Sequence, residues 1–405
     1  MRGLELPTPQ VGATEAWVDQ HLLDLAGDEA PASPRFRGGQ TAADAALAAF
    51  DVRGYAARRN EVLPRSRRGA SALSPYIRHG LLTLPRAWDA VEGGPARDVR
   101  KFRDELLWQE YARHLYARLG ERTRKSLRFD PPERTAPIDP WARNMACMST
   151  NLEELETDGW VVNQTRMWMA SQWTVRHGAR WQDGEDRFFR ELLDGSRAAN
   201  RLGWQWTTGA GSAKAYGFSR WQVQKRAPKL CASCALSRQC PIQEWPSEGE
   251  ASRRRTPPEG LRRDDDLEAT AGPRGVMQHN EPEAVWITAE SLGDDDPALR
   301  AHRDLPVIFV FDAPLLERLH LSRKRLAFLA ETLADLGTRR SLRVVRGKPA
   351  ECLEEVRVAT TFAPVPGFRR IAERIEPAEL HPWTWLAWPH DRSLQSFSAW
   401  RKSLD

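Results

Sequence analysis

The sequence predicts an all-helical domain followed by an α/β domain with a parallel, Rossmann-like sheet. From about residue 40 to 245, apolar residues recur every three or four positions, which is the period of an amphipathic helix. From about residue 283, short apolar runs alternate with helical segments, which is typical of a parallel sheet covered by helices. Between them, residues 247–282 are charged and contain Pro257-Pro258 and Gly272-Pro273, which indicates a linker.

The expected order is an N-terminal segment (1–35), a helical domain (36–246), the linker (247–282) and the α/β domain (283–405). Helices are expected in the helical domain at Ala42–Phe50, Leu81–Val91, Phe102–Leu119, Leu152–Trp160, Arg166–His177 and Arg187–Leu193. Strands are expected at Val285–Thr288, Val307–Asp312, Leu342–Arg346, Val358–Phe362 and Trp383–Trp388. Helices between these strands are expected at Ser322–Leu336, Pro349–Val356 and Gly367–Arg374. In the first 35 residues only Trp17–Leu25 is amphipathic.

Composition narrows the class of protein. The 405 residues exceed one average core, and a net charge of +5 permits a polyanionic partner without requiring one. Seventeen Trp residues are an unusual number, which suggests a redox relay or base stacking. We expect a cytoplasmic protein, because the sequence shows neither a signal-peptide pattern nor a run of 18 apolar residues.

The most informative segment is residues 194–206. It joins Asp194 and Asn200 to Trp204-Gln205-Trp206, and an amide with indoles suits a flat redox heterocycle such as an isoalloxazine. A Trp-rich helix end packed in an ordinary core is the alternative. The segment resembles the flavin-binding signature of the DNA photolyase and cryptochrome family, DGDxAxNNGGWQW. Here Ser196 replaces the second Asp, and Arg201-Leu202 replaces Asn-Gly.

Three further motifs resemble this family. Residues 71–76, SALSPY, are similar to TSxLSPY; residues 104–111, DELLWQEY, to NELxWREF; and residues 159–167, GWVVNQTRM, to GWxHNRxRM. The first would hold the FAD pyrophosphate at a helix start, although Ala70 replaces a Thr, and a Ser cap followed by Pro75 would look the same without a phosphate. The resemblance implies cofactor-binding roles for Tyr55, Ser71, Leu73, Ser74, Gln109, Arg166, Asp194, Ser196 and Asn200.

Within that set, the resemblance implies that Arg166 pairs with Asp194 beside the flavin and that Asn200 lies near flavin N5. The residues that it places on the catalytic, lesion-facing side are Glu105, Trp108, Asn163, Met167 and Trp206. Helical spacing puts Glu105, Trp108 and Gln109 on one face. An exposed Glu105 beside a core Trp108 is the alternative.

The resemblance also implies an electron-transfer chain of Trp residues. Trp204 and Trp181 match its first two members, whereas the third has no clear counterpart among Trp141, Trp168 and Trp173. Core packing is the alternative role for each of these side chains.

Four of the five cysteines form a distinctive set. Cys231 and Cys234 make a CxxC motif, Cys240 precedes a proline, and Cys147 lies 19 residues before Arg166. Such a set holds zinc or an iron–sulfur cluster, or consists of reduced thiols. The spacing resembles the cluster-bearing bacterial branch of the photolyases, which implies a [4Fe–4S] cluster. Cys352 is expected to be a core residue.

The order of the domains implies a circular permutation of the family fold, because family members carry the α/β domain first. Short cues in the last domain support this: Asp296-Pro297-Ala298-Leu299 is similar to the family's DNPAL, and a flexible linker makes permutation inexpensive.

Function follows from the resemblance as light-driven, FAD-dependent repair of cyclobutane pyrimidine dimers in DNA. Asn163 stands where relatives that repair (6-4) photoproducts carry a His, so the dimer is the expected lesion. Gln164 in place of an Arg weakens one phosphate contact. Candidate DNA contacts, each of which is otherwise a solvated surface charge, are Arg97, Arg100, Lys101, Arg103, Lys214, Arg220, Lys225, Arg226 and Lys229.

The alternatives are a cryptochrome-like photoreceptor without repair activity and a flavin-free helical scaffold with zinc. Ala70, Ser196 and Gln164 favour the photoreceptor over the enzyme. An antenna chromophore in the α/β domain is left open, and a monomer is expected.

Overall fold

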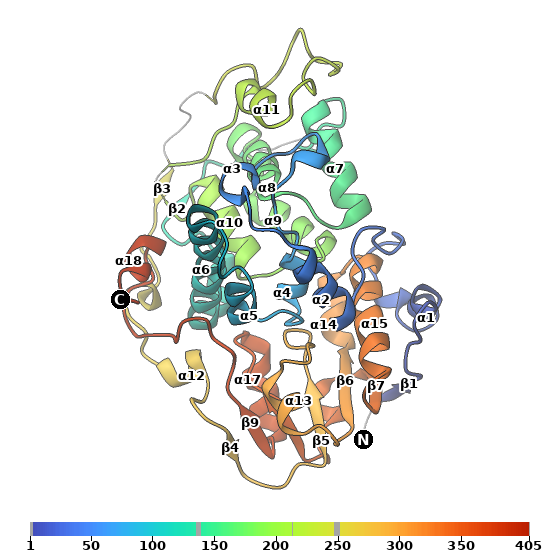
Figure 1. The fold of residues 1–405 in the computed structure, drawn as a ribbon. Helices are drawn as coiled ribbons and strands as arrows, with labels where there is room; N and C mark the ends of the chain where they lie inside the picture. Colours follow the sequence, from blue (N-terminus) through green and yellow to red (C-terminus); the bar gives the residue numbers. More distant parts are fainter. Residues whose placement is uncertain (1–2, 135–138, 213, 247–251, 405) are drawn as a thin grey trace.

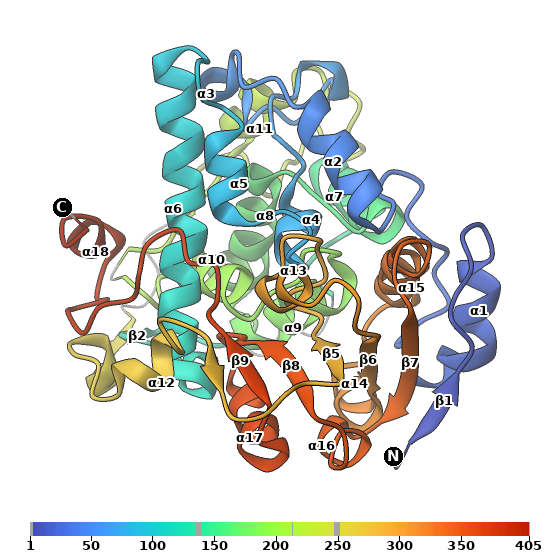
Figure 2. The ribbon, with the colours of Figure 1, turned by 60° about the horizontal axis from the view of Figure 1, so that its bottom comes forward.

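The computed structural model describes residues 3–134, 139–212, 214–246 and 252–404. The structure has a helical domain and a seven-stranded sheet that is flanked by helices (Figure 1, Figure 2). The helical domain lies beyond the ends of the strands (Figure 1). This arrangement matches the α + α/β class expected from the sequence. The start of the expected linker, residues 247–251, lies outside the described residues.

The large sheet has a parallel centre and two antiparallel edges. Its strands in spatial order are β1 (Leu4–Leu6), β7 (Leu342–Gly347), β6 (Val307–Asp312), β5 (Ala284–Ile287), β8 (Val358–Thr361), β9 (Glu379–His381) and β4 (Met277–Gln278). β1 and β4 are the antiparallel edges. The order of the five parallel strands reverses beside β5, so ligands of such sheets bind outside the carboxyl ends of β5 and β8. Those ends face the helical domain, because Leu292 N donates to His79 O.

The helical domain is built around one long helix, α6. Its helices are α2 (Gln40–Ala49), α3 (Tyr55–Arg58), α4 (Ser74–Arg78), α5 (Leu84–Asp89), α6 (Ala96–Leu119), α7 (Ala146–Asp158), α8 (Asn163–Ala170), α9 (Trp181–Glu191), α10 (Ala199–Thr208) and α11 (Arg220–Arg226). The six expected helices are present with shifted ends. The one expected at 166–177 is divided, because α8 passes into a π-helical turn, η4 (Ser171–Arg176).

The remaining elements flank the sheet or connect the domains. They are α1 (Thr14–His21), α12 (Leu267–Ala271), α13 (Pro297–Ala301), α14 (Ala313–Leu319), α15 (Arg323–Gly337), α16 (Pro349–Cys352), α17 (Pro366–Ile375), α18 (Phe397–Arg401), the 3-10 turns η1 (Leu23–Leu25), η2 (Arg65–Arg67), η3 (Gly120–Arg124) and η5 (Glu259–Leu261), and a small sheet of β2 (Phe129–Asp130) and β3 (Arg253–Arg254). α1 packs on α15, and β1 pairs with β7, so the first residues belong to the α/β domain. The described part of the linker is ordered and adds β4 to the sheet.

The prediction of a strand at Trp383–Trp388 is wrong. The fifth parallel strand is β9, which ends before Pro382, a residue without an N–H to continue the ladder. The N–H groups of Leu386 and Ala387 instead donate to a carboxylate oxygen of Glu110 on α6, at 2.6 and 3.1 Å. The fully buried Glu110 therefore holds this segment against the helical domain as a loop.

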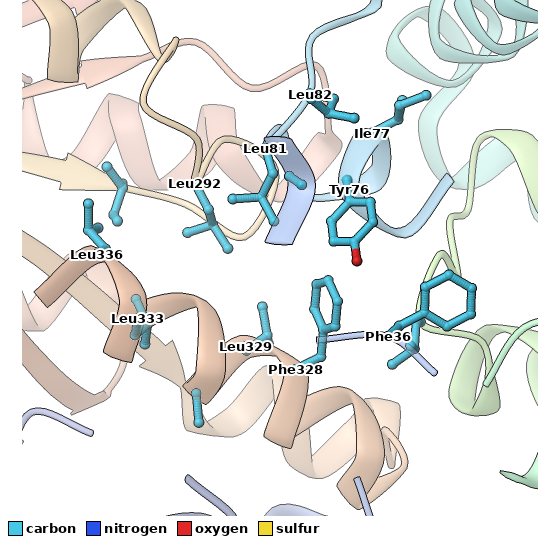
Figure 3. Close-up of a cluster of buried hydrophobic side chains, with 14 of the residues drawn as sticks. Phe36, Tyr76, Ile77, Leu81, Leu82, Leu292, Phe328, Leu329, Leu333 and Leu336 are labelled. Carbon is cyan, nitrogen blue, oxygen red and sulfur yellow. The ribbon is translucent and has the colours of Figure 1, made fainter. Parts of the chain in front are cut away.

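The two domains share one apolar core. Tyr76 and Leu81 of the helical domain pack toward Leu292 and toward Phe328 and Leu333 of α15 (Figure 3), and all five side chains are buried. Burial of a side chain of this size stabilises the fold by about 1.5–3 kcal/mol. The domains are therefore joined by hydrophobic burial as well as by the chain.

The last described residues, 386–404, run along α6 (Figure 2) and are fixed by polar contacts. Tyr111 OH donates to Leu394 O at 2.7 Å. His114 Nε2 lies 2.9 Å from Ala387 O, and His114 Nδ1 accepts from Trp400 Nε1 at 3.1 Å. These contacts require the neutral imidazole with its proton on Nε2.

The fold should therefore lose stability in acid through His114. Burial lowers the pKa of His114 to about 3, below the value of roughly 6.5 for an unfolded chain. The unfolded state then binds the proton first, so stability is complete above pH 6.5 and falls toward pH 3. At pH 5 the loss is about 2 kcal/mol, at 1.36 kcal/mol for each of roughly 1.5 pH units.

His114→Gln keeps a donor and an acceptor without titrating, so its urea unfolding free energy should fall about 2 kcal/mol less than the wild type's between pH 7.5 and 5.0. The exposed-site variant His279→Gln should match the wild type. An unchanged pH dependence in His114→Gln would contradict this assignment.

Candidate functional site

The sequence segment 194–206 forms the loop after α9 and most of α10, and α10 packs on α6, α8 and α9. Arg166 of α8 joins its polar residues. Its Nη2 lies 2.8 Å from Asp194 Oδ2, and its Nη1 donates to Asn200 Oδ1 at 3.3 Å. The structure therefore contains the expected Arg166–Asp194 pair and adds Asn200 to it.

Two polar atoms of this group have no hydrogen-bond partner although they are buried: Asp194 Oδ1, an acceptor, and Asn200 Nδ2, a donor. Buried polar atoms left in this way cost about 1–3 kcal/mol each, and these two are available to hydrogen-bond a ligand. One guanidinium contacts both residues, so the free acceptor and the free donor belong to the same small site. This donor set fits the polar edge of a flat heterocycle such as the flavin ring.

The loop that carries Asp194 is held by the α/β domain. Arg325 of α15 donates to Phe189 O and, at 3.1 Å, to Gly195 O. Arg78 Nε also donates to Gly195 O, at 2.9 Å. A Cβ on Gly195 would lie 2.5 Å from Phe189 O and 2.6 Å from Arg325 Nη1, so only glycine fits here.

The guanidinium of Arg325 is buried, and burial lowers its pKa to about 9. Arg325 and Arg78 were missed in the sequence, because their roles depend on a contact with the backbone of a distant loop.

Two departures from the family signature have structural explanations. Ser196 Oγ accepts the N–H groups of Ala198 and Ala199, at 3.1 and 3.2 Å, and so orders the turn that leads into α10. The buried Arg201 donates to Glu185 Oε2 and Thr123 Oγ1, each at 3.2 Å. Arg201 therefore ties α10 to α9 and to the turn that follows α6.

The expected pyrophosphate motif lies before and within α4. Ser74 Oγ accepts from Trp160 Nε1 at 2.9 Å, and Ser71 Oγ accepts from Leu73 N at 3.5 Å. Leu73 is fully buried. Tyr55 is buried edge-on against Phe102, and Gln109 is half-buried on α6.

The expected lesion-facing residues come from α6, α8 and α10, with mixed environments. Glu105 lies 2.7 Å from Lys101 Nζ and 3.2 Å from Arg59 Nε, and its side chain is 31% exposed. Asn163 and Trp206 are exposed, and Met167 is half-buried. Gln164 Nε2 donates to Tyr216 OH at 2.9 Å, so its amide is engaged within the protein.

Trp108 has a neighbour that the sequence did not indicate. The ring of Phe397, in α18, stacks on it with centroids 3.9 Å apart and an interplanar angle of 12°. Arg401 of the same helix pairs with Asp104. One face of Trp108 is thus covered by residues 397–401.

Two Trp side chains meet at Gly184 of α9. A Cβ on Gly184 would meet the ring of Trp204 at 2.2 Å and that of Trp173 at 3.0 Å, so both indoles abut this glycine. Trp173 lies edge-on to Trp141 with centroids 4.8 Å apart. Trp181 is buried and donates to Ser126 Oγ.

Trp168, the other candidate for the third chain member, stacks on Phe218 instead.

The four expected cysteine ligands line one small cavity of about 20 Å³. Burial, with the neighbouring thiols, raises the pKa of Cys147 to about 12. Arg220, a candidate DNA contact, lines the same cavity and donates to Ser237 O. Cys352 is buried in the core of the sheet, as expected.

Comparison with known proteins agrees with this site. Residues 102–230 match the FAD binding domain of DNA photolyase. A deoxyribodipyrimidine photo-lyase of Thermus thermophilus is 33% identical over 223 residues, covering 52% of this chain and 51% of the relative. A cryptochrome DASH of Gloeobacter violaceus is 26% identical over 242 residues, covering 54% of this chain and 48% of the relative.

A crystal structure of a bacterial class III photolyase from Agrobacterium tumefaciens is 27% identical with a TM-score of 0.38, covering 42% of this chain and 37% of that chain. The chain spans about half the length of the curated relatives it matches.

Fold and site define a protein with a helical FAD-binding domain on a parallel α/β sheet. The match to the FAD binding domain and the photo-lyase relatives support the photolyase/cryptochrome family for this chain. Among the described residues, no helix has the length and apolar character needed to cross a bilayer.

Proposed function

We propose that this chain binds FAD and uses blue light to repair cyclobutane pyrimidine dimers in DNA by electron transfer. The observation that carries the proposal is the Arg166–Asp194–Asn200 group with its two unpaired buried polar atoms, inside the segment that matches the FAD domain. The full activity is a proposal because this chain matches only about half of the length of the photo-lyase relative.

In this proposal Asp194 and Asn200 bind the polar edge of the flavin ring, and Arg166 orients both side chains. Ser71 and Ser74 bind the pyrophosphate, and Leu73, Tyr55, Gln109 and Ser196 complete the FAD site. FAD supplies the light-excited electron donor when it is bound. The protein contributes position, exclusion of water and a fixed electrostatic environment.

On the substrate side, Glu105 would accept a hydrogen bond from the lesion, and Asn163, Met167, Trp108 and Trp206 would contact the extruded bases. An exposed indole such as Trp206 suits base stacking. Asn163 cannot donate a proton as an acid would, which supports dimers over (6-4) photoproducts. Trp204 with Trp181 would return electrons to the cofactor.

A cryptochrome-like photoreceptor without repair is the second candidate, and two contacts favour it. Phe397 covers one face of Trp108, and Gln164 is bonded to Tyr216. Both contacts occupy groups that would otherwise be available to contact DNA. A relative named cryptochrome DASH matches over a similar length.

The proposal includes a [4Fe–4S] cluster held by Cys147, Cys231, Cys234 and Cys240. All four cysteines line one cavity, as the ligands of a single cluster would. We further propose that the chain belongs to the cluster-bearing branch and that its domain order is circularly permuted. We also propose that it is a monomer in the cytoplasm.

Asp194→Ala should lower the FAD content at least about tenfold. It removes an acceptor and leaves Arg166 without its carboxylate, and a charged hydrogen bond contributes about 1.5–3 kcal/mol. FAD released by heating, per mole of chain, measures the effect. Asp183→Ala, on an exposed face of α9, is the matched control and should retain FAD. Equal FAD in both variants would count against the site.

Serine at Cys147, Cys231, Cys234 or Cys240 should remove most of the iron and sulfide, which should be about four of each per wild-type chain. Elemental analysis after anaerobic purification measures both. Cys352→Ser is the control and should retain them, because Cys352 lies in the sheet core. Zinc in place of iron in the wild type would refute the cluster.

Blue light should restore dimer-containing DNA with the reduced protein and leave (6-4) photoproducts intact. Glu105→Ala should slow repair roughly tenfold without releasing FAD, because one charged hydrogen bond to substrate is lost. Trp204→Phe should block photoreduction yet spare repair by protein that is already reduced. Normal photoreduction with neither lesion repaired would instead establish the photoreceptor candidate.

A further inference from the structure

A second polar cluster lies in the α/β domain, away from the flavin site and the cysteines. Glu379 and His381 are two positions apart on β9, so their side chains point to the same face of the sheet. α13 packs against β8 and β9, and His302 directly follows its last residue. Sequence analysis missed this cluster because His302 precedes Glu379 by 77 positions.

The three side chains converge on one point. Glu379 Oε2 lies 2.5 Å from His302 Nε2 and 3.0 Å from His381 Nε2. One ligand atom from each residue lies within 4.8 Å of the other two, and no other trio of His, Cys, Asp or Glu in the described residues does so. Side-chain exposure is 21% for His302, 9% for Glu379 and 5% for His381.

The carboxylate of Glu379 is not engaged by a competing cation among the described residues. The ion-pair partners of Glu379 among the described residues are these two histidines, with no Lys or Arg. The nearby carboxylate of Asp296 is already used by Ser291 Oγ and Leu299 N. Arg340 donates to His302 O, which fixes the backbone that carries this ligand.

Two imidazoles and one carboxylate are a zinc donor set, with a fourth position open to water. We propose that His302, Glu379 and His381 bind a Zn²⁺ ion at the end of β9. Tetrahedral Zn²⁺ would place the nitrogen and oxygen ligands roughly 3.3 Å apart. The two N···O distances would need to open by less than about 1 Å, which the partly exposed His302 allows.

Cobalt substitution tests this proposal on the full chain. Protein treated with a chelator should take up Co²⁺ with visible d–d bands but without the near-ultraviolet thiolate charge-transfer band of cysteine ligation. His302→Ala and Glu379→Gln should lose these thiolate-free bands. His279→Ala, an exposed histidine, and Cys231→Ser should keep them.

Zn²⁺ should also raise the Tm of the wild type but not of His302→Ala, because a metal that binds the folded state stabilises it. This comparison remains decisive if Glu379→Gln folds poorly. Co²⁺ bands that persist in His302→Ala, or that show thiolate ligation alone, would overturn the proposal. Neither outcome depends on FAD binding or repair.

Discussion

The buried guanidinium of Arg325 is the contact on which the proposed flavin site depends. It belongs to the α/β domain but donates to the backbone carbonyls of Phe189 and Gly195, on both sides of the turn that presents Asp194. Desolvation of such a charge is costly, and only well-placed acceptors compensate for it. The domains cannot shift against each other without disturbing the Arg166–Asp194–Asn200 group. A function assigned to the helical domain therefore needs the sheet as scaffold.

Local patterns in the sequence predicted much of the fold and part of the site. The strand at Val307–Asp312 was placed at its observed bounds, because a fully buried parallel strand is a continuous apolar run. The Arg166–Asp194 pair was expected because two motifs resemble those of the photolyase and cryptochrome family. The strand prediction for Trp383–Trp388 was wrong. Its aromatic residues are typical of a strand, but the N–H groups of Leu386 and Ala387 donate to Glu110 in the helical domain and not to a neighbouring strand.

What the sequence could not reveal has a common physical cause: contacts between residues far apart in the chain. Arg201 departs from the family motif, and its role depends on a buried partner, Glu185, on another helix. Phe397 covers Trp108 from the far end of the sequence, and the neighbouring Arg401–Asp104 contact spans 297 positions. No periodicity records such pairings, because each depends on how whole domains meet.

The early strand β1 has a consequence for how the chain is assembled. Thr8 Oγ1 donates to Leu342 O across 334 positions, so during synthesis the residues of β1 are made long before the strand with which they pair. The late residues 386–404 return in the opposite direction, to α6. Each domain is thus completed by a segment from the other end of the sequence. Such long-range closure slows folding, and it interlocks the two domains so that neither is a self-sufficient unit during synthesis.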